Sequence, residues 1–229
     1  MFINNLDQAS KILLIDKPKD WTSFDVVKKI RGLVKKKYNI KKIKVGHSGT
    51  LDPLATGLLV VCVGNKTKDI RNLELLEKEY VGTIKLGCIT DSFDSETPEK
   101  ERKTYSHLSE KDIADVLCKF HGSIQQLPPI FSAIKVKGER LYKKARRGDK
   151  NIELKKRSIT ILDLKLESVN LPLVKFKVKC SKGTYIRSLA HDIGQKLNCG
   201  AYLYELRRVG VGQYKIKDAQ SINDIFASL

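Results

Sequence analysis

The feature that most constrains this chain is a six-residue apolar run, Leu58 to Val63, which directly follows a polar loop. A short apolar run of this kind, bounded by glycines, is typical of a buried strand. A shorter β-like run, Ile43 to Val45, precedes the loop. The loop between them carries three glycines and a single carboxylate, Asp52, and Pro53 biases that residue toward an extended backbone. An acid held between two core strands either stabilises a turn or has a functional role.

Length and charge set broad limits on the rest of the chain. Its 229 residues suit one large domain, and we expect a single domain over residues 1–229. Lys and Arg number 44 against 26 Asp and Glu, which gives a formal charge of +18. Such an excess favours a polyanionic partner, with nucleic acid as the leading candidate. A generally basic protein with solvated lysines would show the same excess.

The cysteines and histidines do not have the spacing of a metal site. The five cysteines form no Cys-x-x-Cys pair, and the four histidines form no His-x-x-x-His pair. We therefore expect reduced thiols, no metal and a cytoplasmic protein. The first residues do not show a basic start followed by a long apolar segment, so no leader and no membrane association are predicted.

Strand-like and helix-like patterns alternate irregularly along the chain, and several predicted strands are consecutive. This order favours an α+β fold with a mixed or mostly antiparallel central sheet flanked by helices. We expect a helix after Thr22, with Asp25 placed as in a capping box, and another after a Thr184 cap. The other predicted helices cover 67–76, 109–120, 141–147 and 218–229, with Ser109 as the cap of the second. The other predicted strands cover 12–15, 80–86, 131–136, 159–169, 173–180 and 201–211.

Three charged features leave alternatives open. The polar loop Gly87 to Pro98 carries Asp91, Asp94 and Glu96, and we interpret it as an acidic surface loop. Arg187 lies in the first turn of a predicted helix, where the dipole disfavours a cation, which indicates that it answers a nearby anion. The basic run 140–147 is either a solvated face or an RNA-contacting insertion.

One partial motif suggests a different chemistry. Gly46-His47-Ser48-Gly49 approaches the nucleophile elbow of serine hydrolases, but its second glycine comes one residue early. A hydrolase that uses Ser48 is therefore a weak alternative.

Six strings, in order along nearly the whole chain, together resemble one family, the bacterial tRNA pseudouridine-55 synthases or TruB family. The first two are DKPKDWTSFDVV and GHSGTLDPLATGLL, and the latter matches the family pattern residue by residue. The others are KEYVGTIKLG, PPIFSAIKVKGERLYKKAR, CSKGTYIRSLAHDIG and LRRVGVGQY.

The resemblance implies the pseudouridine synthase fold and the isomerisation of a uridine at position 55, in the T-arm loop of tRNA. The reaction is redox-neutral and takes place within one nucleotide, so no cofactor and no metal are expected. Asp52 corresponds to the catalytic aspartate, Arg187 to the arginine that pairs with it, and Tyr80 to the tyrosine that stacks on the target base. Tyr185 and Leu206 correspond to residues that line the base pocket, and His47 to a histidine that contacts the RNA loop.

The remaining expectations concern RNA contacts and domain content. Lys17 belongs to a family Lys-Pro pair near the site, where a structural role is expected, and it is also a candidate RNA contact. An insertion at about residues 127–150 resembles the family's RNA-gripping segment, with candidate contacts at Arg140, Lys143, Arg146 and Arg147. Many members carry a C-terminal PUA domain, and a complete one is not expected here. We expect a monomer that binds the tRNA T-arm stem-loop. The alternative is a non-catalytic RNA-binding or tRNA-folding protein on the same fold.

Overall fold

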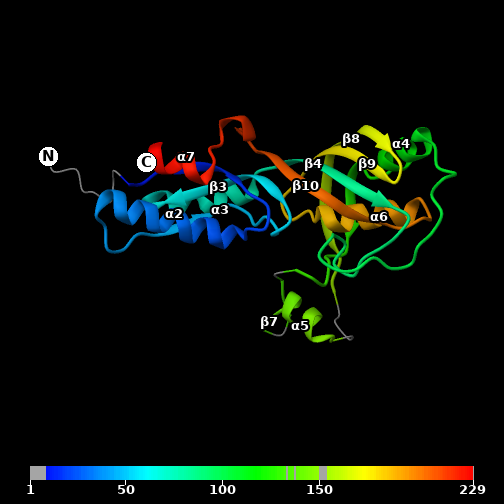
Figure 1. Ribbon diagram of the computed structural model, residues 1–229, viewed down its shortest axis with the longest axis horizontal. Helices are drawn as coiled ribbons and strands as arrows, with labels where there is room; N and C mark the ends of the chain where they lie inside the picture. Colours follow the sequence, from blue (N-terminus) through cyan, green and yellow to red (C-terminus); the bar gives the residue numbers. More distant parts are fainter. Residues whose placement is uncertain (1–8, 133, 137, 150–153, 229) are drawn as a thin grey trace. The chain divides into compact units, whose positions relative to one another are not determined.

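The computed structural model describes residues 9–132, 134–136, 138–149 and 154–228, and within these the side chains of 135 and 226–228 are not described. The chain divides into two compact units (Figure 1). Unit 1 comprises residues 1–80 and 206–229, and unit 2 comprises residues 81–205. Two long strands, β4 (Lys78–Leu86) and β10 (Ala201–Val211), begin in one unit and end in the other.

Unit 1 is built around β3 (Thr56–Val63), the strand predicted from the apolar run. Along one edge β3 pairs antiparallel with β1 (Ile12–Lys17). It also pairs antiparallel with β2 (Val45–His47) and parallel with β10, at Arg207 and Arg208. The other elements of the unit are η1 (Gly64–Asp69), α3 (Ile70–Leu75), β11 (Tyr214–Lys215) and η2 (Ile216–Asp218), with helices α2 (Ser23–Tyr38) and α7 (Ile222–Ser228).

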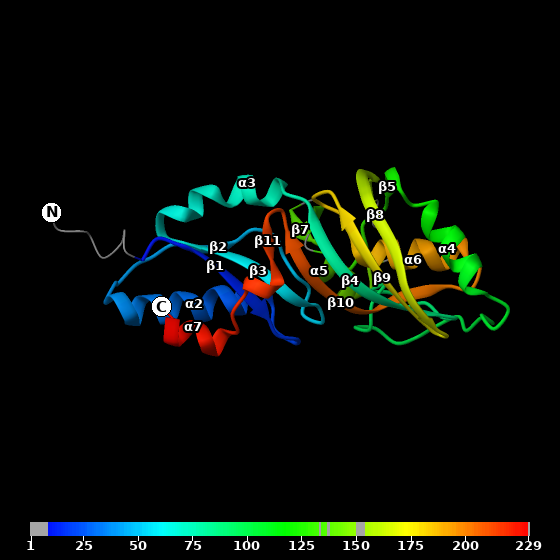
Figure 2. The ribbon, with the colours of Figure 1, turned by 90° about the horizontal axis from the view of Figure 1, so that it is seen from above.

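Both faces of β3 are buried, because helices cover each of them. Leu59, Val61 and Val63 pack with α2 and α7 on one face. Leu58, Val60 and Cys62 pack with Leu73 of α3 on the other. Figure 2 shows α2 and α7 on one side of β1 and β3, and α3 on the opposite side. Burial on both sides explains why β3 reads as a continuous apolar run and not as an alternating one.

Helix α2 begins where the sequence predicted. Thr22 is the N-cap, and its hydroxyl accepts from the backbone N–H of Asp25, while the Asp25 carboxylate accepts from the Thr22 N–H at 2.9 Å. This confirms the capping box. Its inner face is Val26, Val27, Ile30 and Val34, which leaves the opposite face to solvent. Lys35, Lys36 and Lys37 lie in the last turn, where the helix dipole favours cations.

Unit 2 contains a second group of strands in the order β10-β4-β9-β8-β5, so the fold is mixed α/β with a large mixed sheet, as expected. Strands β8 (Arg157–Asn170) and β9 (Leu173–Cys180) form the predicted antiparallel pair, and β5 (Gly122–Gln126) pairs with β8. Its longer helices are α4 (Glu110–Cys118) and α6 (Ile186–Lys196), and Ser109 caps α4 as predicted.

Several boundaries differ from the predictions. The helix expected over 67–76 is a 3-10 turn followed by the short α3. The strand expected over 131–136 appears only as β6 (Lys135–Val136), which pairs with β7 (Glu139–Arg140). The basic segment forms α5 (Leu141–Arg147), and the terminal helix begins at Ile222, not Asp218. Residues 133, 137, 150 and 229 of these predicted segments lie outside the described residues.

Candidate active site

Asp52 lies on the loop that connects β2 to β3, within unit 1. The two strands are paired antiparallel, with His47 opposite Val61, so the ends of the loop are fixed by the core sheet. The Ser48 N–H donates to the Val60 carbonyl at 3.0 Å, and the Ala55 N–H donates to the Asp52 carbonyl at 3.1 Å. Asp52 itself is half-buried. A carboxylate on a short loop between paired strands is held in place by backbone hydrogen bonds on either side.

Ser23 fixes the residue directly before Asp52. Its side chain is buried, and its hydroxyl donates to the Leu51 carbonyl at 3.1 Å. The Leu51 N–H in turn donates to the Ser23 hydroxyl oxygen at 2.8 Å. Ser23 is the first residue of α2, so the capped start of this helix is tied to the Asp52 loop. The sequence reasoning missed Ser23, although its place next to the N-cap Thr22 indicates a fixed side chain.

Lys17 fixes the residue directly after Asp52. Its side chain is fully buried at the end of β1. Its ammonium donates to the carbonyls of Pro18 at 2.8 Å, Trp21 at 2.6 Å and Pro53 at 3.2 Å. Burial lowers the pKa of Lys17 to about 8, and the nearby Asp52 carboxylate acts in the opposite direction. Lys17 was predicted as a candidate RNA contact. The structure buries its side chain, and its ammonium holds the backbone beside Asp52.

Arg208 is the third buried side chain that bonds to the backbone of this loop, and it holds the first part of the loop. It is 1% exposed, and its Nε donates to the Leu58 carbonyl at 2.7 Å while Nη2 donates to the Gly49 carbonyl at 3.1 Å. The backbone of Arg208 also pairs with Gly57, where a Cβ would lie 2.3 Å from the Arg208 carbonyl oxygen. Only glycine permits this approach. Strand β10 also carries Glu205 and Arg207, so no signal in the sequence singles out Arg208.

His47 lies at the start of the loop and is half-buried. Its Nδ1 accepts from the Gly49 N–H at 3.3 Å. Burial lowers the pKa of His47, and the charge of Arg208 lowers it further. The imidazole is therefore neutral near pH 7 and offers hydrogen bonds, not a charge, to a ligand.

Tyr80 and Leu206 are the other predicted pocket residues of unit 1. Tyr80 is 8% exposed, at an inward position of β4, and Leu206 is half-buried on β10. Burial at alternate positions is what an ordinary strand tyrosine would also show. Their contact with a base stays a prediction.

Tyr185 and Arg187 lie at the start of α6, within unit 2. Gln126 fixes the backbone of Tyr185 from both sides, since it accepts from the Tyr185 N–H at 2.8 Å and donates to the Tyr185 carbonyl at 3.0 Å. The predicted cap at Thr184 is wrong, because Tyr185 is the N-cap and the Thr184 hydroxyl donates to the Ser181 carbonyl. Sequence reasoning also missed Gln126.

Arg187 is buried, and the structure supplies an anion for it within unit 2. Its Nη1 lies 3.5 Å from the Asp94 carboxylate and donates to the Ser92 carbonyl at 3.1 Å. The Asp94 carboxylate also accepts from the Ser92 hydroxyl at 2.6 Å and the Glu96 N–H at 2.9 Å. The prediction of a surface loop is wrong at Asp94, which is 6% exposed because it answers a buried guanidinium. The expected pairing of Arg187 with Asp52 stays a prediction.

The basic insertion presents two kinds of cation. Arg147 is bonded to Glu139 and Asp149, and Arg146 is bonded to Glu96. Arg140 and Lys143 are exposed and form no ion pair within the described part of the chain. Of the four RNA contacts predicted in this segment, these two carry charges that no carboxylate in the described residues neutralises, whereas Arg146 and Arg147 are already paired with carboxylates.

No group of three or more His, Cys, Asp or Glu side chains among the described residues could hold a metal ion. The five cysteines are free thiols, and four of them are buried. No helix in the described ranges is long and apolar enough to span a bilayer.

Comparison with known proteins decides the family. Residues 35–186 match the model of the TruB family pseudouridylate synthase N-terminal domain, and residues 187–228 match that of the tRNA pseudouridylate synthase B C-terminal domain. The chain belongs to the TruB family of pseudouridylate synthases. It is therefore an enzyme of the isomerase class, and the resemblance found in the sequence is confirmed.

TruB relatives match over nearly the whole chain. The tRNA pseudouridine synthase B of Chloroherpeton thalassium is 48% identical over 227 residues, which are 99% of this chain and 93% of that protein. The enzyme of the same name from Phocaeicola vulgatus is 47% identical, over 94% of this chain and 91% of that protein.

Solved structures confirm the pseudouridine synthase fold. A chain in the crystal structure of a Cbf5-Nop10-Gar1 complex has a TM-score of 0.71 and 29% identity, over 96% of this chain and 54% of its own length. A chain in the structure of an H/ACA RNP bound to a substrate RNA containing 2'-deoxyuridine has a TM-score of 0.68 and 27% identity. It is matched over 53% of its length, so this TruB chain spans about half of each.

Proposed function

We propose that the protein isomerises uridine 55 to pseudouridine in the T-arm loop of tRNA, with Asp52 as the catalytic carboxylate. The tRNA named in the relatives supports the substrate class. The observation that carries the role of Asp52 is the construction of its loop. Three buried polar side chains, Ser23, Lys17 and Arg208, fix Leu51, Pro53 and Gly49 around this one acid. Burying a polar group costs free energy unless the group is hydrogen-bonded, and here the three buried groups bond to the backbone on either side of Asp52.

The reaction needs few components. The bond between N1 of the base and C1′ of the ribose breaks, the base turns, and C5 bonds to C1′ while the C5 proton is lost and N1 gains one. Asp52 can act by attack on the ribose, by attack on the base or by removal of a sugar proton. Each route starts from an ionised carboxylate. Atoms and electrons balance within one nucleotide, so the proposal includes no cofactor and no metal.

The target base must leave the RNA stack before it can react, which costs a few kcal/mol. Stacking on Tyr80 and contacts with Tyr185 and Leu206 would offset that cost in the proposed pocket. His47, neutral near pH 7, would bond to the loop that the base has left. Arg187 stays the candidate for the arginine that the family has at this site. Arg140 and Lys143 would contact the T-arm backbone, and we propose a monomer that acts in the cytoplasm as a single domain.

The test is the pseudouridine map of an unmodified tRNA transcript after reaction. The wild type is expected to modify position 55, whereas Asp52→Asn is expected to lose at least about a thousandfold in rate and to keep RNA binding. Asp69→Asn is the matched control, because Asp69 is a half-exposed acid of the same unit whose ion pair, within the described residues, is with Lys66 across one helical turn. Product formed by Asp52→Asn at the wild-type rate would remove Asp52 from the mechanism. RNA binding without product from the wild type would favour a non-catalytic RNA-folding role.

A further inference from the structure

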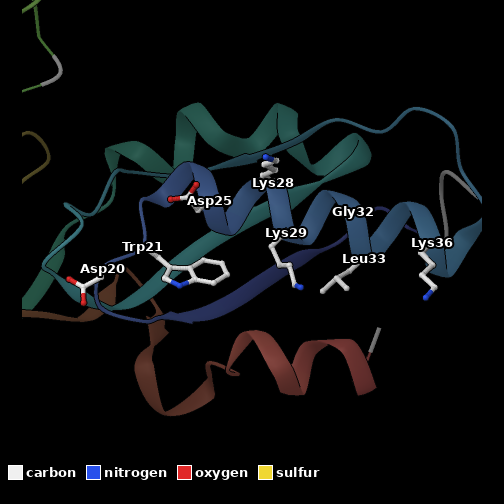
Figure 3. A pocket seen from close by; sticks show the side chains of 8 residues that line it. All are labelled: Asp20, Trp21, Asp25, Lys28, Lys29, Gly32, Leu33 and Lys36. Atoms are coloured by element: carbon white, nitrogen blue, oxygen red, sulfur yellow. The ribbon is translucent and has the colours of Figure 1, made fainter. Parts of the chain in front are cut away.

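A pocket of about 620 Å³ lies on the solvent face of α2, outside the residues assigned to the reaction. Its helical lining follows one stripe, Asp25, Lys28, Lys29, Gly32, Leu33 and Lys36, and Asp20 and Trp21 complete it. Figure 3 shows Trp21, Lys29, Leu33 and Lys36 on the same side of the helix. The half-buried Trp21 and Leu33 provide an apolar floor, while Lys28, Lys29 and Lys36 are exposed.

The part of the chain that follows Asp25 is strongly basic. Residues 26–51 contain nine Lys and Arg and no Asp or Glu. Within the described part of the chain, none of these nine cations forms an ion pair. The pocket lining itself has three lysines against two acids, Asp20 and Asp25, which lie before this segment, and the charge of Lys28 acts on the Asp25 carboxylate. Lysines that are not neutralised by the protein attract a polyanion.

One end of the pocket lies next to the Asp52 loop. The Asp20 N–H donates to the Pro53 carbonyl at 2.9 Å, and the Trp21 carbonyl accepts from Lys17, which also bonds to Pro53. From Lys28 to Lys36 the stripe then runs about 12 Å along the helix. A chain of phosphates that leaves the vicinity of Asp52 would meet an aromatic ring first and three ammonium groups after it. Aromatic rings beside cations are the elements from which single-stranded nucleic acid sites are built.

We propose that this face of α2, defined by Trp21, Lys28, Lys29, Leu33 and Lys36, is a second RNA-binding surface. This surface binds the phosphate backbone of the substrate RNA where the RNA continues beyond the Asp52 loop. An unpaired base or a ribose of the RNA packs on the Trp21 ring. The inference rests on the proposed function for the identity of the RNA.

Gly32 allows a test that leaves every one of these side chains in place. It lies in the middle of the stripe, and a Cβ there would meet no atom within 4 Å. Glu, Lys and Gln all have a higher helix propensity than glycine. Gly32→Glu and Gly32→Lys therefore place opposite charges in the pocket on an intact helix, and Gly32→Gln is the uncharged control of equal size.

The measurement is the dissociation constant for an unmodified tRNA transcript at about 0.1 M salt. Gly32→Glu is expected to weaken binding about fivefold, Gly32→Lys to tighten it and Gly32→Gln to leave it within about twofold. The double variant Lys28→Ala, Lys36→Ala is expected to reduce the salt dependence of binding by about two counterions. The Glu and Gln variants binding alike would overturn the proposal.

Turnover separates this proposal from the proposed function. With wild-type protein, product at position 55 tests the function alone. In Gly32→Glu, KM is expected to rise while kcat at saturating tRNA stays at the wild-type value. A fall in kcat with KM unchanged would overturn the proposal of an RNA-binding surface on α2. It would not contradict the proposed function. Vesicles with phosphatidylserine provide the last arm, because a charge effect on vesicle binding without one on tRNA would assign the face to a membrane.

Discussion

Lys17 of unit 1 and Arg187 of unit 2 are both buried cations beside proposed site residues, and they are answered in different ways. Lys17 meets three backbone carbonyls. Arg187 meets a carboxylate, Asp94, and one carbonyl. Carbonyl dipoles fix an ammonium in place but do not cancel its charge, so burial still lowers the pKa of Lys17. The comparison shows one cation used to fix the backbone beside Asp52, and another held in a buried ion pair.

The largest expected effect is on the ion pair of unit 2. Asp94→Ala removes the carboxylate that answers Arg187, so the free energy of unfolding should fall by about 3–5 kcal/mol. Urea denaturation measures it. The control is Asp91→Ala in the same loop, since Asp91 pairs with Lys100 at the surface and should cost about 1 kcal/mol or less. An equal loss of unfolding free energy in the two variants would show that the buried pair stabilises the protein no more than the surface pair does.

The second prediction concerns the pH dependence of Lys17. Its pKa is about 8 in the folded protein, against an ordinary 10.5, so between these pH values the unfolded chain binds more protons. The free energy of unfolding of the wild type should therefore rise relative to that of Lys17→Met, by at most about 3 kcal/mol. Denaturation of both proteins at pH 7 to 10.5 measures the difference. A difference that falls over this range would mean that the carbonyl hydrogen bonds outweigh burial.

A smaller effect is expected for two buried serines of unit 1. Ser23→Ala leaves the Leu51 N–H without its partner, which should cost about 1–3 kcal/mol. It should also lower kcat about tenfold or more, with KM little changed, because Asp52 is the next residue. Ser48 is the control, since its buried hydroxyl has no hydrogen-bond partner in the described structure. Ser48→Ala should stay within about 0.5 kcal/mol of the wild type and keep its activity. Equal kcat values for the two variants would contradict a positioning role for Ser23.

The parts of the fold that could be predicted depend on short stretches of sequence. The capping boxes at Thr22 and Ser109 involve residues three positions apart, and both are present. Strand β3 was predictable because its apolar run has no polar interruption. Of the site, Asp52 and the residues of the family motifs were found through resemblance to the TruB family. Their catalytic roles remain predictions.

The residues that support the site were missed, because their partners are distant in the sequence. Ser23 bonds to Leu51, 28 residues away, and Gln126 bonds to Tyr185, 59 residues away. Arg208 bonds to Gly49, 159 residues away. Asp94 looks like any acid of a polar loop until the fold brings Arg187 to it, 93 positions along the chain. Local composition carries no information about such pairs.

By itself, the sequence determined the strand that fills the core of unit 1, the start of α2 and the lone acid on the loop before β3. It also determined the one-sided charge of residues 26–51. Only the tertiary structure decided which buried groups hold that acid and which cations stay available. A hydrogen bond or ion pair forms only where folding places its two partners within a few ångströms of each other. The loop of Asp52 is held by hydrogen bonds of this kind, through residues that the motif around Asp52 does not contain.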